Sequence, residues 1–173
     1  MKIVITGSSC SGKTTVIKTL EREGFKVLHE IPRQLIKKYK KEGINPTTNI
    51  HKFQYEILKL TLERNKNIRD DEITFLDIDI PEGVAYFKAR NMQPPEWLTS
   101  AIEKHAIYDK VIFLEQAPFF ENDNVRLEDH KTSKKIGEII EKTYEKLNYK
   151  VHKIPFIKLD ERIKIIKRIC GLI

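Results

Sequence analysis

Nine residues near the start of the chain combine two glycines, a lysine and hydroxyl side chains at spacings that suit phosphate chemistry. They match the phosphate-loop (P-loop) pattern G-x-x-x-x-G-K-[ST] and are Gly7, Ser8, Ser9, Cys10, Ser11, Gly12, Lys13, Thr14 and Thr15. In such a turn, backbone N–H groups form a concave site for phosphate oxygens, and the helix that follows adds positive potential. Lys13 is expected to reach the β- and γ-phosphates, and the Thr14 hydroxyl to ligate Mg²⁺. Thr15 is expected either to contact the α-phosphate or to pack in the first helical turn.

Acidic side chains follow an apolar run at residues 72–76. Asp77 comes directly after the run and is expected to hold Mg²⁺ or to accept a proton from an attacking hydroxyl. A helix cap or a surface carboxylate is the alternative interpretation. Asp79 is a candidate for the same site or for the cap of a helix that Pro81 begins. Glu82 falls in the first turn of that helix, where it would offset the helix dipole or reach an acceptor.

Two further charged groups stand close together after the second apolar run. Glu30 would bind hydroxyls of an acceptor, and Arg33 lies one helical turn beyond it. The alternative is a local ion pair between the two side chains, which is worth under about 1 kcal/mol at a surface. Arg126 is a candidate to close over the phosphates and stabilise developing charge, and is otherwise a solvated arginine in a loop.

Short β-branched runs alternate along the chain with stretches of helical spacing. Strands are expected at residues 2–6, 25–29, 72–76, 109–114 and 149–154. Helices are expected at residues 14–23, 33–41, 48–69, 81–92, 96–106, 131–147 and 160–170. Thr47 or Thr48 is suited to cap the longest helix. Residues 115–131 lack clear periodicity and predict a mobile lid loop.

Strands that alternate with helices imply an α/β fold whose parallel sheet is covered on both faces. Ligands of such sheets bind beyond the carboxyl ends of the strands. This rule gathers the P-loop, Glu30, Asp77 and the loop at 115–131 around one crevice. No linker, repeat or low-complexity tract divides the sequence, so residues 1–173 are expected to form a single domain.

The composition limits the classes of protein to which the chain can belong. Its 173 residues are 40% hydrophobic and 33% charged, which is typical of a soluble globular domain. The net charge of +7 suits anionic phosphates, whereas the absence of a basic stripe with interleaved aromatic residues argues against nucleic acid. Two cysteines without disulfide or zinc spacing, no signal peptide and no long apolar run predict a cytoplasmic protein that does not enter a membrane. No feature of the sequence indicates an oligomeric state.

Four segments carry a resemblance to a known family. They are K-I-V-I-T-G-S-S-C-S-G-K-T-T at residues 2–15, H-E-I-P-R-Q-L-I at 29–36, F-L-D-I-D-I-P-E-G-V-A-Y at 75–86 and N-D-N-V-R-L-E-D at 122–129. On these segments the chain resembles the AAA_28-type P-loop family, a group of small kinase-like NTPases related to ribosylnicotinamide kinase domains. The resemblance spans nearly the whole chain, and the P-loop is its most specific part.

The resemblance implies a three-layer P-loop fold with five parallel strands in kinase-type order. It implies Mg²⁺-dependent phosphoryl transfer from ATP or GTP to a small nucleoside-like or other hydroxyl acceptor. The implied site residues are Lys13, Asp77 and Arg126 for catalysis, Thr14 and Asp77 for Mg²⁺, and Glu30, Arg33 and Glu82 for the acceptor.

One position departs from the family pattern, because Ile78 stands where the family usually has arginine. The departure allows a changed acceptor. It also allows two other functions: an NTPase or nucleotide-dependent switch that acts on a protein or RNA partner, and a nucleotide-binding module without chemistry.

Overall fold

A computed structural model describes residues 1–46, 48–118 and 130–173 of the chain. The strands are β1 (Lys2–Thr6), β2 (Lys26–Leu28), β3 (Thr74–Asp77), β4 (Lys110–Leu114) and β5 (Val151–Ile154). The helices are α1 (Lys13–Arg22), α2 (Ile31–Lys41), α3 (Ile50–Asn65), α4 (Glu82–Lys88), α5 (Glu96–His105), α6 (His130–Lys146) and α7 (Leu159–Ile169). Each lies where the hydrophobic pattern predicts it, with bounds that differ by a few residues.

The five strands form one parallel sheet in the order β2-β3-β1-β4-β5. The predicted α/β fold with kinase-type strand order is therefore confirmed. The strand β1 lies between β3 and β4, so the chain changes its winding direction there, which is where open α/β sheets bind ligands. The register places Ile5 of β1 beside Asp77 of β3, and Thr6 beside Phe113 of β4. The P-loop therefore begins next to Asp77.

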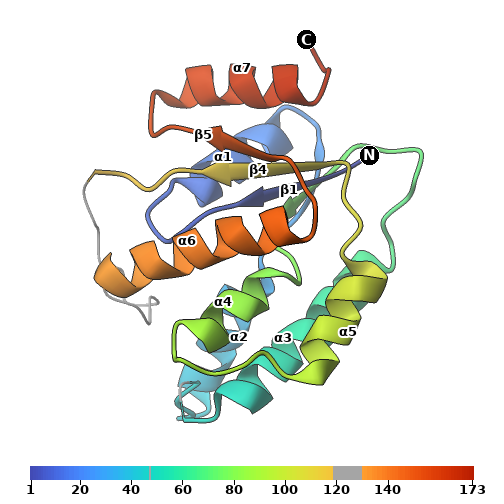
Figure 1. The fold of residues 1–173 in the computed structure, drawn as a ribbon. Helices are drawn as coiled ribbons and strands as arrows, with labels where there is room; N and C mark the ends of the chain where they lie inside the picture. The colour runs from blue at the N-terminus through green and yellow to red at the C-terminus, as the bar shows by residue number, and fades with distance from the viewer. Residues whose placement is uncertain (47, 119–129) are drawn as a thin grey trace.

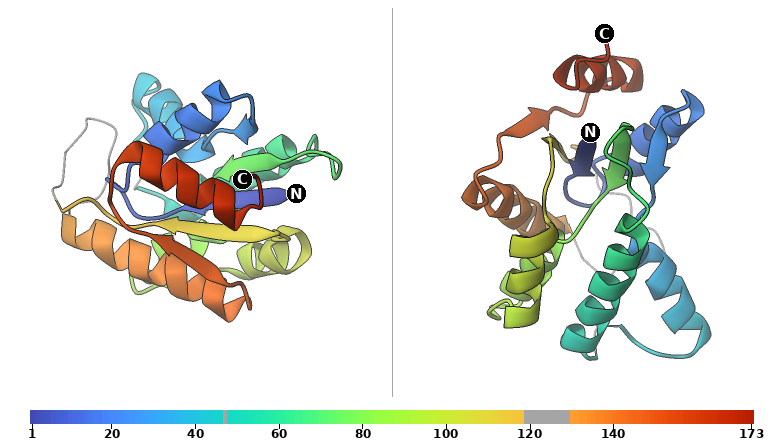
Figure 2. Two further views of the ribbon diagram at one scale, coloured as in Figure 1. Left: turned by 90° about the horizontal axis from the view of Figure 1, so that it is seen from above. Right: turned by 90° about the vertical axis from the view of Figure 1, so that its right-hand side faces the viewer.

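Alternating side chains of β1 reach opposite faces of the sheet. Ile3 and Ile5 pack with α1 and α7 in one buried cluster, whereas Val4 packs with residues of α3, α4, α5 and α6 in another. Figure 1 shows α7 and α1 on one side of the sheet and these other helices on the opposite side. The view from above in Figure 2 shows α7 lying over the strands. The two clusters make the three layers of the fold.

The helix α2 packs on α3 and builds a third, smaller cluster that includes Leu35 and the tilted, contacting rings of Tyr39 and Phe53. The cap predicted for the long helix is wrong. Asn49 caps α3, because its side chain accepts a hydrogen bond of 3.0 Å from the Lys52 N–H. Thr48 precedes that cap, and Thr47 lies outside the described residues. Among the helices that the structure describes, none is long and apolar enough to cross a bilayer.

Candidate active site

The P-loop leaves β1 at Thr6 and runs into α1 at Lys13, with a glycine needed at each end. Gly7 has φ of 139°, and a Cβ on it would lie 2.4 Å from the Leu114 carbonyl oxygen. Gly12 has φ of 77°, and a Cβ there would lie 2.8 Å from an Arg162 nitrogen. Both positions combine a left-handed backbone with close contacts, so only glycine fits without strain.

Every carbonyl from Gly7 to Ser11 accepts a hydrogen bond. The Lys13 ammonium donates to those of Gly7 at 2.7 Å and Ser8 at 2.8 Å. The three remaining donors come from other segments: the Gln116 amide to Ser9 at 3.1 Å, the Ala117 N–H to Cys10 at 2.9 Å and Arg162 to Ser11 at 2.7 Å. In a planar trans peptide the N–H points opposite to the C=O. Each bond therefore points the N–H of the same peptide group away from its own donor, and the five bonds together fix the peptide planes of the loop.

The P-loop forms one wall of a cavity of about 290 Å³. Other walls come from Glu30, Arg33, Asp77 and Glu82, together with Ala117, Ser133 and Phe156. Burial lowers the pKa of the Lys13 ammonium, and the carboxylates of Asp77, Glu30 and Glu82 act in the opposite direction. The cavity thus places two cations, Lys13 and Arg33, among three acids and beside a row of backbone amides.

Asp77 lies at the base of this cavity, at the carboxyl end of β3. Its side chain is 4% exposed, and its Oδ1 has no hydrogen-bond partner among the described residues. Burial, reinforced by the charge of Glu30, raises the pKa of Asp77 to about 6. Thr14, which lines the same cavity, is exposed. A carboxylate oxygen without a partner and a nearby hydroxyl suit Mg²⁺, which usually takes one or two protein ligands and completes its shell with water and phosphate.

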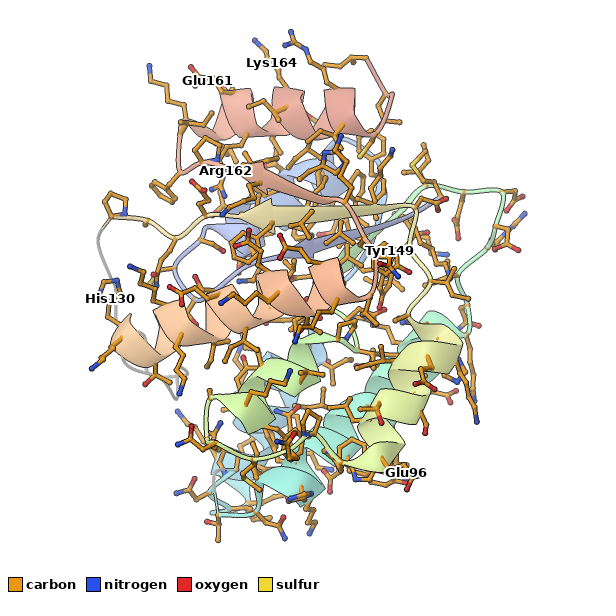
Figure 3. All side chains as sticks on the ribbon, viewed as in Figure 1. Glu96, His130, Tyr149, Glu161, Arg162 and Lys164 are labelled. Carbon is orange, nitrogen blue, oxygen red and sulfur yellow. The ribbon has the colours of Figure 1, made fainter. Side chains whose placement is uncertain are left out.

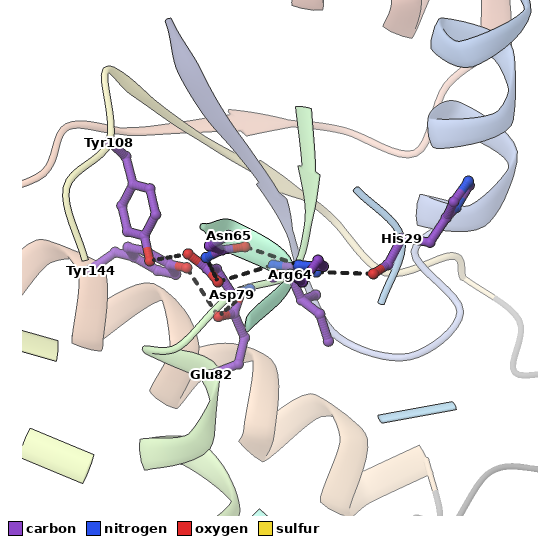
Figure 4. Close-up of polar contacts among 8 residues, drawn as sticks. His29, Arg64, Asn65, Asp79, Glu82, Tyr108 and Tyr144 are labelled. Carbon is purple, nitrogen blue, oxygen red and sulfur yellow. Dashed lines mark hydrogen bonds and ion pairs between the residues drawn. The ribbon is translucent and has the colours of Figure 1, made fainter. Parts of the chain in front are cut away.

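Asp79 does not face this cavity, so both roles expected for it are wrong. Its carboxylate accepts hydrogen bonds from Arg64 at 3.0 Å, Asn65 at 2.8 Å and the Tyr108 hydroxyl at 2.7 Å (Figure 4). The helix α4 begins after Pro81 and has no side-chain cap. Asp79 is a fully partnered buried carboxylate that anchors α3 to the end of β3.

Glu82 is buried in the first turn of α4, the position expected for it, where its carboxylate offsets the helix dipole. Its Oε2 accepts hydrogen bonds from the Asp79 N–H at 3.1 Å and the Tyr144 hydroxyl at 3.0 Å (Figure 4). Its Oε1 makes no hydrogen bond of ordinary geometry within the described residues, and the nearby Thr6 hydroxyl acts to lower the pKa of the group. Burial raises the pKa of Glu82 to about 7. One oxygen of this carboxyl group therefore links α4 to α6 and to the end of β3, and the residue also lines the cavity.

The raised pKa values of Asp77 and Glu82 predict that stability of the ligand-free protein falls as pH rises. An acid whose pKa is higher in the folded state stabilises the fold below its unfolded pKa, and the stabilisation is lost as pH passes the folded pKa. The window runs from about pH 4 to about pH 7. At about 1.4 kcal/mol for each pKa unit, the upper limits are about 3 kcal/mol for Asp77 and about 3.5 kcal/mol for Glu82. Melting temperatures measured from pH 5 to pH 7.5 should decline, and the decline should be smaller in Glu82→Gln.

The exposed Glu103 supplies a control for this experiment. Glu103→Gln should leave the slope of melting temperature against pH unchanged. A slope for Glu82→Gln that equals that of the unmodified protein would contradict the assignment.

Glu30 and Arg33 lie where β2 gives way to α2. Glu30 is the N-cap residue of α2, and the Arg33 Nε donates to its Oε1 at 2.7 Å. The predicted local ion pair is therefore present. Both side chains also line the cavity beside the P-loop, so the ion pair and a role in the site are compatible.

A second cavity of about 110 Å³ opens between α2, α3 and α4. Its walls are mostly apolar and include Ile36, Phe53, Ile57, Leu58 and Leu98. It shares six lining residues with the phosphate-side cavity: Ser9, Glu30, Arg33, Ile78, Glu82 and Tyr86. We call it the apolar cavity. The two cavities meet at the Glu30–Arg33 pair.

The structure thus brings the nine P-loop residues, Glu30, Arg33, Asp77 and Glu82 around connected cavities. Arg126 and most of the predicted lid loop lie outside the described residues. The described start of that loop, Gln116 and Ala117, is bonded to the P-loop.

Arg64 and Gln54 line the apolar cavity from α3 and are not among the site residues predicted from the sequence. Arg64 donates to the His29 carbonyl at 2.9 Å, to the Ile78 carbonyl at 3.2 Å and to Asp79, so it joins the ends of β2 and β3 (Figure 4). Gln54 is 4% exposed. Both fall on the buried face of α3, in phase with Leu58 and Thr61. A search of that face for polar residues would have found them.

Ile78 occupies a strained position beside the site. Its φ of 54° is in the left-handed region, where a β-branched residue costs on the order of 1–3 kcal/mol. Its N–H donates to Ile5 at 3.1 Å and its carbonyl accepts from Arg64, so both peptide groups are fixed. In this chain the arginine that contacts the turn at residues 78–79 is Arg64 of α3, whereas position 78, where the family usually has arginine, is isoleucine.

Three solved structures illustrate the fold. A deoxyadenosine kinase from M. mycoides with bound dCTP has a TM-score of 0.69 at 16% identity, with 100% of both chains covered. A thymidylate kinase from Candida albicans has a TM-score of 0.68 at 17% identity, covering 98% of this chain and 90% of that one. A NadR protein in complex with NR has a TM-score of 0.74 at 15% identity, covering 98% of this chain and 51% of that one. Identities this low establish the fold alone.

Sequence comparison identifies the family. Among curated proteins, none matches the chain at a significant level. The model of an AAA domain family, AAA_28, matches residues 2–162, which is most of the chain. The chain therefore belongs to the AAA_28 family of AAA domains and has the P-loop kinase type of fold.

Proposed function

We propose that the protein transfers a phosphoryl group from a Mg²⁺-bound nucleoside triphosphate to a hydroxyl of a small, nucleoside-like acceptor. The observation that carries the proposal is the junction of the two cavities. A cavity lined by the P-loop meets an apolar one, and the Glu30–Arg33 pair stands where a hydroxyl of the acceptor would face the γ-phosphate. A plain NTPase has no need of the apolar cavity.

The P-loop would form the binding site for the phosphate donor. The loop's N–H groups and the Lys13 ammonium would bind the β- and γ-phosphates of ATP or GTP. Asp77 and Thr14 would hold Mg²⁺, which neutralises charge on the phosphate oxygens. The chain's own contribution is to position the two reactants and stabilise charge. Arg126 remains a candidate to cover the phosphates.

The acceptor side is built to bind a flat, mostly apolar group with a polar edge. Ile57, Leu58 and Leu98 supply apolar surface, and the buried Gln54 amide supplies a donor and an acceptor. Glu30 and Arg33 would bind hydroxyl groups at the mouth of the apolar cavity. Solved structures of this fold include one deoxyadenosine kinase with bound dATP or dCTP, and a NadR protein in complex with NR, which supports a nucleoside-like acceptor.

The direct test is an assay of phosphoryl transfer with purified protein, Mg²⁺ and either ATP or GTP. The acceptors are nucleosides, deoxynucleosides and ribosylnicotinamide, and mass spectrometry detects phosphorylated products. Product formation would support the kinase. Phosphate release without any acceptor would support the NTPase or switch that Ile78 suggested, and nucleotide binding with neither would support a module without chemistry.

Filling the apolar cavity should separate acceptor binding from nucleotide binding. Ile57→Trp places a large ring in that cavity and is expected to raise KM for the acceptor about tenfold, or about 1.4 kcal/mol, while Kd for the nucleotide stays the same. The control is Leu60→Trp on the same helix, because Leu60 is 44% exposed. Equal KM values for the two variants would place the acceptor elsewhere.

A further inference from the structure

Arg162 of α7 is a buried cation directly behind the P-loop. The residue is 3% exposed, and one guanidinium nitrogen donates to the Ser11 carbonyl at 2.7 Å. The guanidinium also lies over the Phe156 ring, 5.4 Å from its centroid. Figure 3 shows Arg162 between α7 and the sheet, whereas Glu161 and Lys164 of the same helix point outward.

This arginine has no acidic partner among residues 1–46, 48–118 and 130–173. None of the ion pairs that join those residues includes it, and its Nε has no hydrogen-bond partner within them. Burial lowers the pKa of the guanidinium. A buried charge without a counter-charge is costly. The charge of this arginine therefore disfavours the ligand-free fold. A bound anion would supply the missing counter-charge.

The position of the guanidinium indicates which anion. One of its nitrogens lies 2.8 Å from where a Cβ on Gly12 would be. Gly12, Ser11 and Phe156 all line the phosphate-side cavity, so a single layer of backbone separates the arginine from that cavity. Its hydrogen bond also fixes the Ser11–Gly12 peptide, so the Gly12 N–H points away from α7.

We propose that Arg162 is a positioning residue for nucleotide binding, which orients the Gly12 N–H and supplies a positive charge that nucleotide phosphates compensate. The proposal rests on the proposed nucleotide site. It predicts different effects of removing the charge on the stability of the ligand-free protein and on its affinity for nucleotide. Removing the charge should leave the ligand-free protein as stable or more stable, and should weaken its affinity for a triphosphate.

The test measures Kd for ATP and for GTP, each with Mg²⁺, by calorimetry, and melting temperature without nucleotide. Arg162→Met removes the charge and keeps the length of the side chain. For the triphosphate that the unmodified protein binds, Arg162→Met is expected to raise Kd about tenfold. Added salt should change this difference little, because a buried charge is only weakly screened. Arg162→Lys keeps the charge and should retain more of the affinity. The control is Arg168→Met, because Arg168 is exposed on the same helix.

The outcomes separate this inference from the proposed function. Failure of the unmodified protein to bind either triphosphate would overturn the nucleotide site itself. Binding by the unmodified protein with equal Kd for Arg162→Met would overturn the role of Arg162 alone. A lower melting temperature with unchanged Kd would make the arginine purely structural. If Arg162→Met does not fold, Arg162→Gln, which keeps a donor without the charge, replaces it in the same comparison.

Discussion

Lys13→Ala is expected to reduce nucleotide turnover by at least about 100-fold, or about 2.7 kcal/mol of transition-state stabilisation. The ammonium is the cation held by the P-loop itself, through the Gly7 and Ser8 carbonyls and the Ser11 hydroxyl. Its charge also faces Asp77, Glu30 and Glu82 across the cavity. Removing it leaves Arg33 as the one described cation among three acids that line the cavity, so both affinity and turnover should fall.

Steady-state kinetics and calorimetry with the same triphosphate check this expectation. Lys18→Ala is the matched control, because Lys18 is exposed on the same helix and does not line either cavity. It should leave kcat and KM unchanged. Turnover by Lys13→Ala at the rate of the unmodified protein would overturn the assignment of the P-loop.

The outline of the fold was predictable because its signals are local. Each strand is a short β-branched run, and each long helix repeats apolar residues three or four apart. The P-loop pattern fixes the end of β1 and the start of α1 together. The helix cap was harder to predict, because Thr48 and Asn49 are both good caps and only the backbone path of the helix start selects between them.

The candidate site was predictable where a residue ends a strand. Asp77 and Glu30 follow apolar runs, and the rule for parallel sheets brings such ends together. The sequence could not separate Asp77 from Asp79, which are two residues apart. Their difference arises from Arg64 and Tyr108, which come from distant segments and bind Asp79 alone. Gln116 and Arg162 were missed for the same reason, since their partners are backbone carbonyls of the P-loop.

These carbonyl contacts give the P-loop a second set of constraints besides its glycines. The residue types at positions 7–15 allow the turn, but Gln116 and Arg162 hold its peptide planes. Gln116 directly follows β4, whereas Arg162 belongs to α7, the last helix. The phosphate site is therefore a property of the assembled sheet rather than of the P-loop segment alone.

Asp77→Asn is expected to lower kcat by about 100- to 1,000-fold, or about 2.7–4 kcal/mol. The side chain keeps its shape and loses the charge that would hold Mg²⁺ beside the phosphates. The stability of the ligand-free variant, by contrast, should not fall. Because burial raises the pKa of Asp77 to about 6, its charged form at pH 7.5 disfavours the ligand-free fold, and a neutral amide removes that cost. The melting temperature of the ligand-free variant at pH 7.5 should be equal to or higher than that of the unmodified protein.

Asp79→Asn is the contrasting variant two residues away, and it tests whether the two acids have the separate roles that the structure gives them. It leaves the buried Arg64 without its counter-charge, and breaking such a pair costs about 3–5 kcal/mol. Its melting temperature at pH 7.5 should therefore fall. Kinetics at several Mg²⁺ concentrations complete the comparison, because only Asp77→Asn should require more Mg²⁺ to reach half of its maximal rate. An Asp77→Asn protein that keeps normal turnover and Mg²⁺ dependence would show that the carboxylate at the end of β3 does not serve the phosphates.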